Sequence, residues 1–391
     1  MKMKLLALAI AGAFVAPVAM AEHEEGAPAN AMGNVTIYGQ VNGSFYFVRD
    51  GAKDSSTSTT QVSNDASRLG VKGSEDLGGG LNAIWQIETG FNVDGTNDQI
   101  TGSGFKTGSG LGTRNTFVGL NGAAWGTAIL GSHDTPYKTA TRGLDLFADT
   151  IADNRSLMGM TGGGITTHDV RATDVLAYVS PNMGGFSVAV GYVAGAENAA
   201  FPNDKKGDAW SAYGMYNAGP INASLSYQRV NGGNADTNLA QPIPFGIGDD
   251  HDATAWKLGG GYSMDAFAVN AVYEHTTGDL GFGDKLDQNN WYLAGKFSFT
   301  PNDAVKLAYT SAGKTHGGTT AEITDSDAHQ WSVGYDHNLS KRTMVYALYT
   351  KLDNKANADY ALGLRNGMTG GASGGFESDP SAFALGIKHS F

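Results

Sequence analysis

The chain contains no cysteine and only 10 prolines among its 391 residues. The absence of cysteine excludes disulfides, thiolate metal sites and cysteine nucleophiles. After residue 21 the sequence has no run of about 20 apolar residues, which excludes a helical membrane span. Basic residues are also scarce, because 26 Lys and Arg stand against 38 Asp and Glu, and the net charge of −12 argues against nucleic acid as a partner.

The first 21 residues are typical of a secretory signal peptide. Lys2 and Lys4 give a positive start, residues 5–15 are almost wholly apolar, and a small-x-small cleavage site ends at Ala21. The sequence therefore predicts export and a mature chain of 391 − 21 = 370 residues. An acidic N-terminal extension follows at 22–33, and its alternatives are a disordered tail or a weak cation or periplasmic contact site.

Glycine is abundant, with 56 residues, and segments of alternating polarity fill the rest of the chain. In the last nine residues, Phe383, Leu385 and Ile387 fall on one face of a strand, whereas Ala384 and Lys388 fall on the other. A strand with one side in lipid and one side in water alternates in this way.

Sixteen such segments are expected to form strands, and short turns between them alternate with long links. This asymmetry is typical of an outer-membrane barrel with short periplasmic turns and long external loops. Closure removes edge strands, and a barrel of this size leaves an aqueous lumen. We therefore predict an all-β fold, a transmembrane antiparallel β-barrel over residues 34–391. The predicted strand centres are Gln40, Gly70, Trp85, Phe117, Ile129, Tyr178, Val190, Tyr213, Leu225, Leu258, Ala271, Leu293, Leu307, Val333, Ala347 and Gly386.

Several motifs resemble those of the Gram-negative general diffusion porins of beta- and gammaproteobacteria. Residues 34–40 read NVTIYGQ and resemble the first strand of that family, and residues 67–81 read SRLGVKGSEDLGGGL and resemble its second hairpin. The motif RNTFVGL at 114–120, followed by HDTPYK at 133–138, is similarly diagnostic. The resemblance covers nearly all of residues 34–391. It implies a homotrimer of 16-stranded barrels in outer-membrane lipid, which passes small hydrophilic solutes and ions by passive diffusion.

The long link over residues 134–174 is unusual inside a barrel, and links of this length are commonly functional. It carries Asp145, Asp149 and Asp153, whose spacing would place them along one side of a helical turn. The resemblance implies that this link folds into the lumen as the constriction loop, with its acidic side narrowing the pore; an exposed outside loop is the alternative. The apolar anchors on the barrel wall would be Leu146, Phe147 and Ile151.

Basic residues are expected to face this loop from the barrel wall. Because Leu69 and Val71 point to lipid, Arg68 and Lys72 should point inward. Arg114 takes the matching place in the fourth strand. A charge on the lipid side would cost about 2–4 kcal/mol at mid-depth, which favours the lumen for all three cations.

Two interpretations of these charges remain open. In the first, the basic wall faces the loop acids across a narrow water column, and the transverse field orients dipolar solutes. In the second, the arginines pair with the loop carboxylates and brace the loop, as Arg142 and Arg155 beside the acids also would. Lys388 and Lys296 face inward by parity. Because screening limits electrostatic reach to about 8 Å, acids on a loop in the lumen favour a mild cation preference.

The terminal Phe391 resembles the assembly signal of the porin family. No nucleophile elbow and no HExxH motif is present, and the nine His residues show no ligand spacing. We therefore predict a channel that is not an enzyme and has no cofactor and no metal site. The alternatives are a solute-specific outer-membrane channel and a structural or adhesive surface β-protein, which channel conductance in a planar bilayer would distinguish.

Overall fold

Strands dominate the computed structural model of the chain. It describes residues 34–95, 111–161, 166–194, 207–231, 252–279, 285–317, 323–363, 371–373 and 375–391. The predicted signal peptide at 1–21 and the extension at 22–33 lie outside the described residues. In the described part, no helix has the length and apolar character that crossing a bilayer requires.

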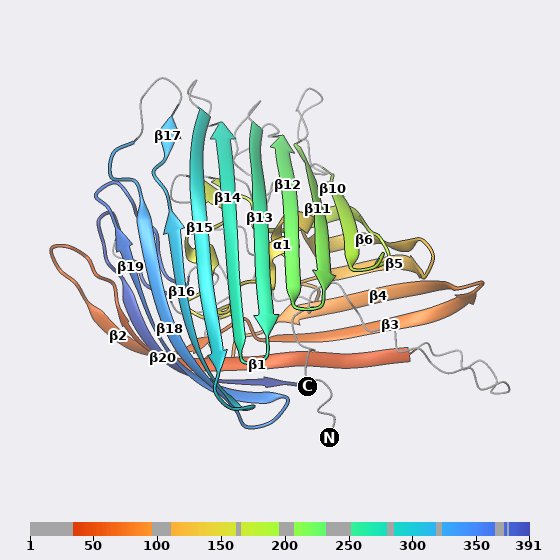
Figure 1. Cartoon of the computed structure of the whole chain (residues 1–391), viewed down its shortest axis with the longest axis horizontal. Coiled ribbons are helices and arrows are strands. Elements are labelled where there is room, and N and C mark those ends of the chain that lie inside the picture. The colour runs from red at the N-terminus through yellow and green to blue at the C-terminus, as the bar shows by residue number, and fades with distance from the viewer. Residues whose placement is uncertain are drawn as a thin grey trace.

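The elements follow one another with short turns at one end of the barrel and longer links at the other (Figure 1). In chain order they are β1 (Asn34–Arg49), β2 (Ser58–Asn64), β3 (Arg68–Gly78), β4 (Leu81–Gly90), β5 (Thr116–Gly122), β6 (Gly126–Asp134), α1 (Pro136–Arg142), the 3-10 helix η1 (Asn154–Ser156), β7 (Met160–Thr161), β8 (Thr166–Thr167), β9 (Arg171–Val179), β10 (Phe186–Val193), β11 (Asp208–Ala218), β12 (Ile221–Asn231), β13 (Asp252–Met264), β14 (Phe267–Asp279), β15 (Lys285–Ser298), β16 (Asp303–Ala312), β17 (His316–Gly317), β18 (Ala328–Asn338), β19 (Thr343–Asn354) and β20 (Ser381–Ser390).

One antiparallel sheet closes on itself because β1 pairs with β20. β2 and β3 both pair with β1, and β16 and β17 both pair with β15, so each couple counts as one barrel strand. The 18 hydrogen-bonded strands therefore form a barrel of 18 − 2 = 16 strands. Each of the sixteen predicted centres lies within a different barrel strand, so the predicted fold is confirmed.

Alternation sorts the side chains of each strand between lipid and lumen. In β12, Leu225 and Tyr227 are exposed on the outer face, whereas Ser224 and Ser226 are buried on the inner face. The outer wall is apolar because a membrane offers no partner for polar groups.

Large aromatic side chains form a band on this outer wall from β10 round to β1. Neighbouring rings touch across the strands, with centroids 4.7 Å apart for Tyr192 and Trp210 and 4.4 Å apart for Tyr273 and Trp291. We call this band the aromatic girdle, since such rings anchor a barrel at the membrane interface. Its members are Tyr192, Trp210, Tyr227, Trp256, Tyr273, Trp291, Tyr309, Trp331, Tyr349, Phe383 and Phe47.

The aromatic girdle is interrupted over β3, β4, β5, β6 and β9. The outward positions of β3, β5 and β6 hold no aromatic side chain. The outward aromatics of β4 and β9, Trp85 and Tyr178, lie in the halves of their strands nearest the short turns. At its loop end this arc therefore carries fewer interfacial rings than the rest of the barrel; one ring there is that of Phe91, which follows β4 and is 37% exposed.

Phe391, directly after β20, pairs with Gly39 of β1 where the sheet closes. Its backbone N–H donates to the Gly39 carbonyl at 3.1 Å, and its carbonyl accepts from the Gly39 N–H at 3.0 Å. A Cβ at Gly39 would lie 2.5 Å from the Phe391 ring, so glycine allows the ring to rest directly on the β1 backbone. The ring remains 42% exposed on the lipid side.

We expect deletion of Phe391 to lower the amount of protein in the outer membrane far more than Phe391→Tyr does. Deletion removes both closing hydrogen bonds and the ring, whereas tyrosine keeps the backbone contacts and most of the apolar surface. Quantitative immunoblots of outer-membrane fractions would measure the difference. Equal levels for the deletion variant and the wild type would contradict a role for Phe391 in assembly.

Candidate functional site

The link between β6 and β9 lies inside the barrel, where its first part forms α1 against β11, β12 and β13 (Figure 1). Thr135 caps the helix because its side chain accepts from the Lys138 N–H, and Pro136 occupies the first turn. The Tyr137 N–H donates to Ser211 Oγ of β11 at 2.8 Å. The helix is thus fixed to the inner wall by backbone contacts as well as by packing.

The predicted apolar anchors of the loop contact the barrel wall. Phe147 and Ile151 are fully buried, and Leu146 is partly buried against the same apolar cluster. A Cβ at Gly334 of β18 would lie 2.8 Å from the Phe147 ring, so this position must stay free of a side chain for the ring to fit. Lys306 places its Nζ 4.8 Å from the centre of the same ring. The inward-folded loop of the sequence analysis is therefore confirmed.

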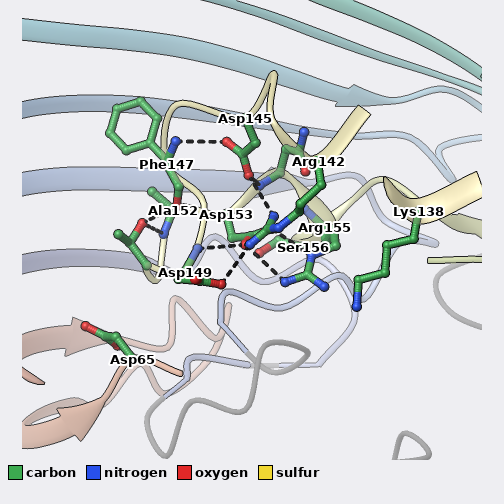
Figure 2. A network of polar contacts seen from close by, with 12 residues as sticks. Asp65, Lys138, Arg142, Asp145, Phe147, Asp149, Ala152, Asp153, Arg155 and Ser156 are labelled. Carbon is green, nitrogen blue, oxygen red and sulfur yellow. Dashed lines mark hydrogen bonds and ion pairs between the residues drawn. The ribbon is translucent and has the colours of Figure 1, made fainter. Parts of the chain in front are cut away.

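Three loop carboxylates converge on the guanidinium of Arg142 (Figure 2). The N···O distances from Arg142 are 3.3 Å to Asp145, 2.9 Å to Asp149 and 2.6 Å to Asp153. Asp153 also accepts from Arg155 Nε at 3.2 Å. We call these five residues the loop cluster. Its members brace one another, which agrees with the second of the two interpretations drawn from the sequence.

The expected helical turn through the three acids is wrong. Residues 145–153 form successive turns, and Asp149 has a backbone φ of +59°. The chain thereby folds back around Arg142 and brings the carboxylates together from different directions. The spacing of four residues does not place them on one side of a helix.

Burial and pairing shift the protonation of the loop cluster. Burial, and after it the nearby carboxylate of Asp153, raise the pKa of Asp145 to about 6. Burial acts in the same direction on Asp149, but Arg68 and Arg142 outweigh it and hold the pKa of Asp149 well below its usual range. Arg142 and Arg155 likewise lower the pKa of Asp153 against the effect of burial. Asp149 and Asp153 therefore stay ionised at neutral pH.

The tip of the loop is tied to the wall at β1 and β3. Arg68 donates to the Asp149 carboxylate at 3.1 Å, so this predicted basic residue touches the acid directly. Asn42 of β1 donates through Nδ2 to the Asp149 carbonyl at 3.0 Å and to the Asp65 carbonyl at 3.0 Å. Asp149 thus joins the loop cluster to the barrel strands.

A buried cluster of hydroxyls behind Asn42 was not predicted from the sequence. The Asp65 carboxylate accepts hydrogen bonds from Ser44 at 2.5 Å and Tyr346 at 2.7 Å, and also from the Tyr46 hydroxyl. Asp65 lies between β2 and β3, where Ala66 adopts a φ of +60° and the strand bulges. No local sequence signal marks this bulge.

Arg114, another predicted wall residue, pairs outside the loop cluster. Arg114 forms an ion pair with Glu88 of β4 at 2.6 Å. Asp134, at the end of β6, accepts from Arg171 at 3.0 Å and from Lys138 at 2.8 Å. Burial lowers the pKa of Lys138 to about 7 despite this carboxylate.

The far arm of the loop is held by a second buried network on β13 and β14. Glu274 accepts from the Tyr137 hydroxyl at 2.5 Å and from the Gly159 N–H at 2.7 Å. Lys257 lies 3.3 Å from Glu274 and 2.5 Å from Asp169. The loop is therefore attached to opposite sides of the lumen.

Two inward-facing lysines differ from all these cations. Lys72 has its Nζ 5.2 Å from the centre of the Tyr38 ring, and Lys388 is in register with Asn42 beside the loop tip. Neither forms an ion pair with a carboxylate among the residues that the structure describes. We call Lys72 and Lys388 the unpaired lysines. In the same residues, no group of three or more His, Asp and Glu is placed to hold a metal ion.

Some of the unpredicted partners could have been found in the sequence. Glu88 alternates with the outward Ile87, so strand parity alone places it in the lumen near Arg114. Asp65, Asn42 and Glu274 could not be assigned in this way, because their roles depend on the path of the loop.

The geometry agrees with three comparisons to known proteins. A family model described as Gram-negative porin matches residues 7–357. Outer membrane porin protein 32 of Delftia acidovorans is 29% identical over 398 aligned positions that cover 100% of both chains. Major outer membrane protein P.IB of Neisseria sicca is 26% identical, over 93% of this chain and 96% of that protein.

Two solved porin structures share the barrel fold of this chain. The anion-selective porin from Comamonas acidovorans superposes with a TM-score of 0.74 and 26% identity, over 92% of this chain and 100% of that one. The trimer form of OmpT from Vibrio cholerae shares the fold, with a TM-score of 0.64 and 17% identity over 92% of this chain and 99% of that one.

Proposed function

The chain belongs to the Gram-negative porins and is an outer-membrane channel for passive diffusion rather than an enzyme, and from this premise we propose that its inner loop forms the narrowest part of an anion-preferring water path. The walls of this passage would be Arg68, Lys72, Arg114 and Asp149. The more deeply buried Asp145, Asp153 and Arg155 would hold the loop in place through Arg142.

The observation that carries the anion preference is the imbalance between paired acids and unpaired cations. All three loop acids are within 3.3 Å of an arginine. The unpaired lysines have no such compensation among the described residues. Screening limits the reach of charges on the outer loops to about 8 Å, so local charge at the passage outweighs the net charge of −12.

This proposal reverses the cation preference expected from the sequence. That expectation assumed that the loop acids face the permeating ion, whereas their pairing with Arg142, Arg155 and Arg68 leaves little negative potential to act on it. The anion-selective porin from Comamonas acidovorans supports the new assignment through its likeness in sequence and fold.

The reversal potential of the wild-type channel tests the proposal. In a planar bilayer with a KCl gradient, we expect a potential of the sign set by chloride, because chloride is concentrated by the unpaired lysines. A sign set by potassium would reject the anion preference. Absence of conductance would reject an open passage through the loop.

We further propose that the channel is a homotrimer whose contacts use the arc where the aromatic girdle is interrupted. A wall that meets lipid needs interfacial rings, whereas a wall that meets another subunit does not. The trimer form of the structurally similar OmpT supports this assembly. Small hydrophilic anions are the proposed solutes. Residues 1–21 remain the proposed cleaved signal peptide, and residues 22–33 the proposed extension.

The absence of cysteine allows a direct test of the subunit contact. Leu130 on β6 and Leu225 on β12 are 58% and 57% exposed in the single chain. In the purified oligomer, we expect Leu130→Cys to react with a lipid-soluble maleimide several-fold more slowly than Leu225→Cys. After dissociation the two rates should agree. Equal rates in the oligomer would place the contact on another arc.

A further inference from the structure

A buried lysine at the start of α1 shares its counter-ion with an arginine. The side chain of Lys138 is 5% exposed, and its Nζ lies 2.8 Å from the Asp134 carboxylate, its one ion-pair partner among the described residues. The same carboxylate accepts from Arg171 at 3.0 Å. These three side chains together carry a charge of 1 + 1 − 1 = +1, so the charge on Lys138 is only partly compensated.

Lys257 on β13 shows how another buried lysine of this lumen is compensated. Its side chain is 1% exposed, and its Nζ lies 2.5 Å from Asp169 and 3.3 Å from Glu274. Two carboxylates therefore surround one ammonium at Lys257, whereas at Lys138 one carboxylate serves two cations. The two lysines are similar in burial and differ in the negative charge beside them.

Two further features of the surroundings disfavour a positive charge on Lys138. It stands in the first turn of α1, which holds no acidic side chain, and this end of a helix carries partial positive charge. On the other side lies the loop cluster, and in Figure 2 no dashed contact joins Lys138 to the carboxylates drawn there. Burial, with repulsion from Arg155 and Arg171, outweighs the attraction of Asp134 and lowers the pKa of Lys138 to about 7.

We propose that Lys138 is a pH-responsive element of the passage, charged on the acidic side of neutrality and uncharged on the alkaline side. This inference rests on the anion preference proposed above. Loss of one proton takes the group of Asp134, Lys138 and Arg171 from +1 to 0. Because the Asp134 side chain is 17% exposed, this group borders the water of the lumen. The anion preference of the channel should therefore decrease as the pH rises through neutrality.

His133, at the end of β6, is a second titratable side chain at this place, and histidine ordinarily titrates near neutral pH. It is buried, and its Nδ1 lies 2.8 Å from the Asp134 carbonyl oxygen. The remaining charged neighbours are paired, since Arg155 bonds Asp153 and Arg114 bonds its own carboxylate on β4. Protonation of His133 would change the local charge in the same direction, so the experiment has to separate His133 from Lys138.

Reversal potentials in a KCl gradient at about pH 6 and about pH 8.5 test the proposal. A unit charge about 6–10 Å from an ion changes its local concentration about two- to threefold in water, so the chloride-to-potassium permeability ratio of the wild type should fall by about this factor. Lys138→Arg keeps the charge and should hold the ratio near the wild-type value of the lower pH. Lys138→Met carries no charge and should hold it near the wild-type value of the higher pH.

An unchanged ratio in the wild type over this range would overturn the role of Lys138 and leave the anion preference standing. Full pH dependence in both variants would also overturn it, because His133 or another group would then titrate. A potential of the sign set by potassium at both pH values, with the pH dependence still lost in Lys138→Arg, would reject the anion preference alone. The two proposals can thus fail separately.

Competitive acetylation of the wild-type channel gives the decision if the variants do not assemble. Acetic anhydride reacts with the neutral amine, so the rate at Lys138 should level off above about pH 8, whereas a lysine with the ordinary pKa of about 10.4 continues to gain reactivity. Peptide mass spectrometry would follow Lys138, with the exposed Lys341 as the reference. A rate at Lys138 that still rises about tenfold per pH unit above about pH 8, or no reaction at any pH, would reject the assignment.

Discussion

Replacing Arg142 with methionine is expected to release the inner loop while the barrel remains folded. The substitution leaves the carboxylates of Asp145, Asp149 and Asp153 close together without their shared cation. Removing one partner of a buried ion pair costs about 3–5 kcal/mol, so the locally open form of the loop should become about two to four orders of magnitude more populated.

Limited trypsin digestion would measure this release. Arg155 is buried inside the wild-type barrel and should resist cleavage, whereas in the Arg142→Met variant the chain should be cut there. Glu377→Gln is the control, because it breaks an exposed ion pair with Lys53 without removing a trypsin site and should leave the digestion pattern unchanged. Resistance of the Arg142 variant equal to that of the wild type, with an unchanged single-channel current, would contradict the bracing role of Arg142.

Reversing the charge of both unpaired lysines is expected to change the ion preference of the channel from anions to cations. In water, a unit charge 6 Å from an ion contributes about 0.7 kcal/mol, or about threefold in local concentration. Lys72→Glu and Lys388→Glu together change the local charge by four units. The reversal potential in a KCl gradient should therefore change sign, and the effect should weaken at high salt.

Lys341→Glu provides the matched control for this charge reversal. Lys341 lies in the exposed turn between β18 and β19, outside the lumen, so its reversal should leave the potential nearly unchanged. A comparable shift in this control would mean that net charge rather than the passage sets the preference. Substitution of Asp149 is less informative, because it would also remove a partner from Arg68 and Arg142.

The barrel could be predicted from the sequence because apolar and polar residues alternate along each strand according to whether they face lipid or the lumen. Leu225 and Tyr227 against Ser224 and Ser226 are sufficient to assign the two faces of β12 without knowledge of its neighbours. The anchors Phe147 and Ile151 could be identified for the same reason, since apolar residues in a polar loop must find an apolar surface.

The charge pairing could not be predicted, because it depends on contacts between distant parts of the chain. Arg68 and Asp149 are 81 positions apart and meet only through the path of the loop. The turn at Asp149 brings it to Arg142 in a conformation that side chains rarely favour, so helical spacing gave the wrong geometry. The ion preference depends on this pairing, and the expectation for it changed accordingly.

The seam between β1 and β20 also has consequences for how the protein folds. Gln40 pairs with Ser390, which is 390 − 40 = 350 positions away along the chain. Contacts between residues so far apart in sequence form slowly, because the entropy cost of closing a long loop comes before any stabilising hydrogen bond forms. One edge of β1 therefore stays unpaired until β20 has been synthesised and exported. Protection of that edge by another protein during transit would be needed to prevent aggregation.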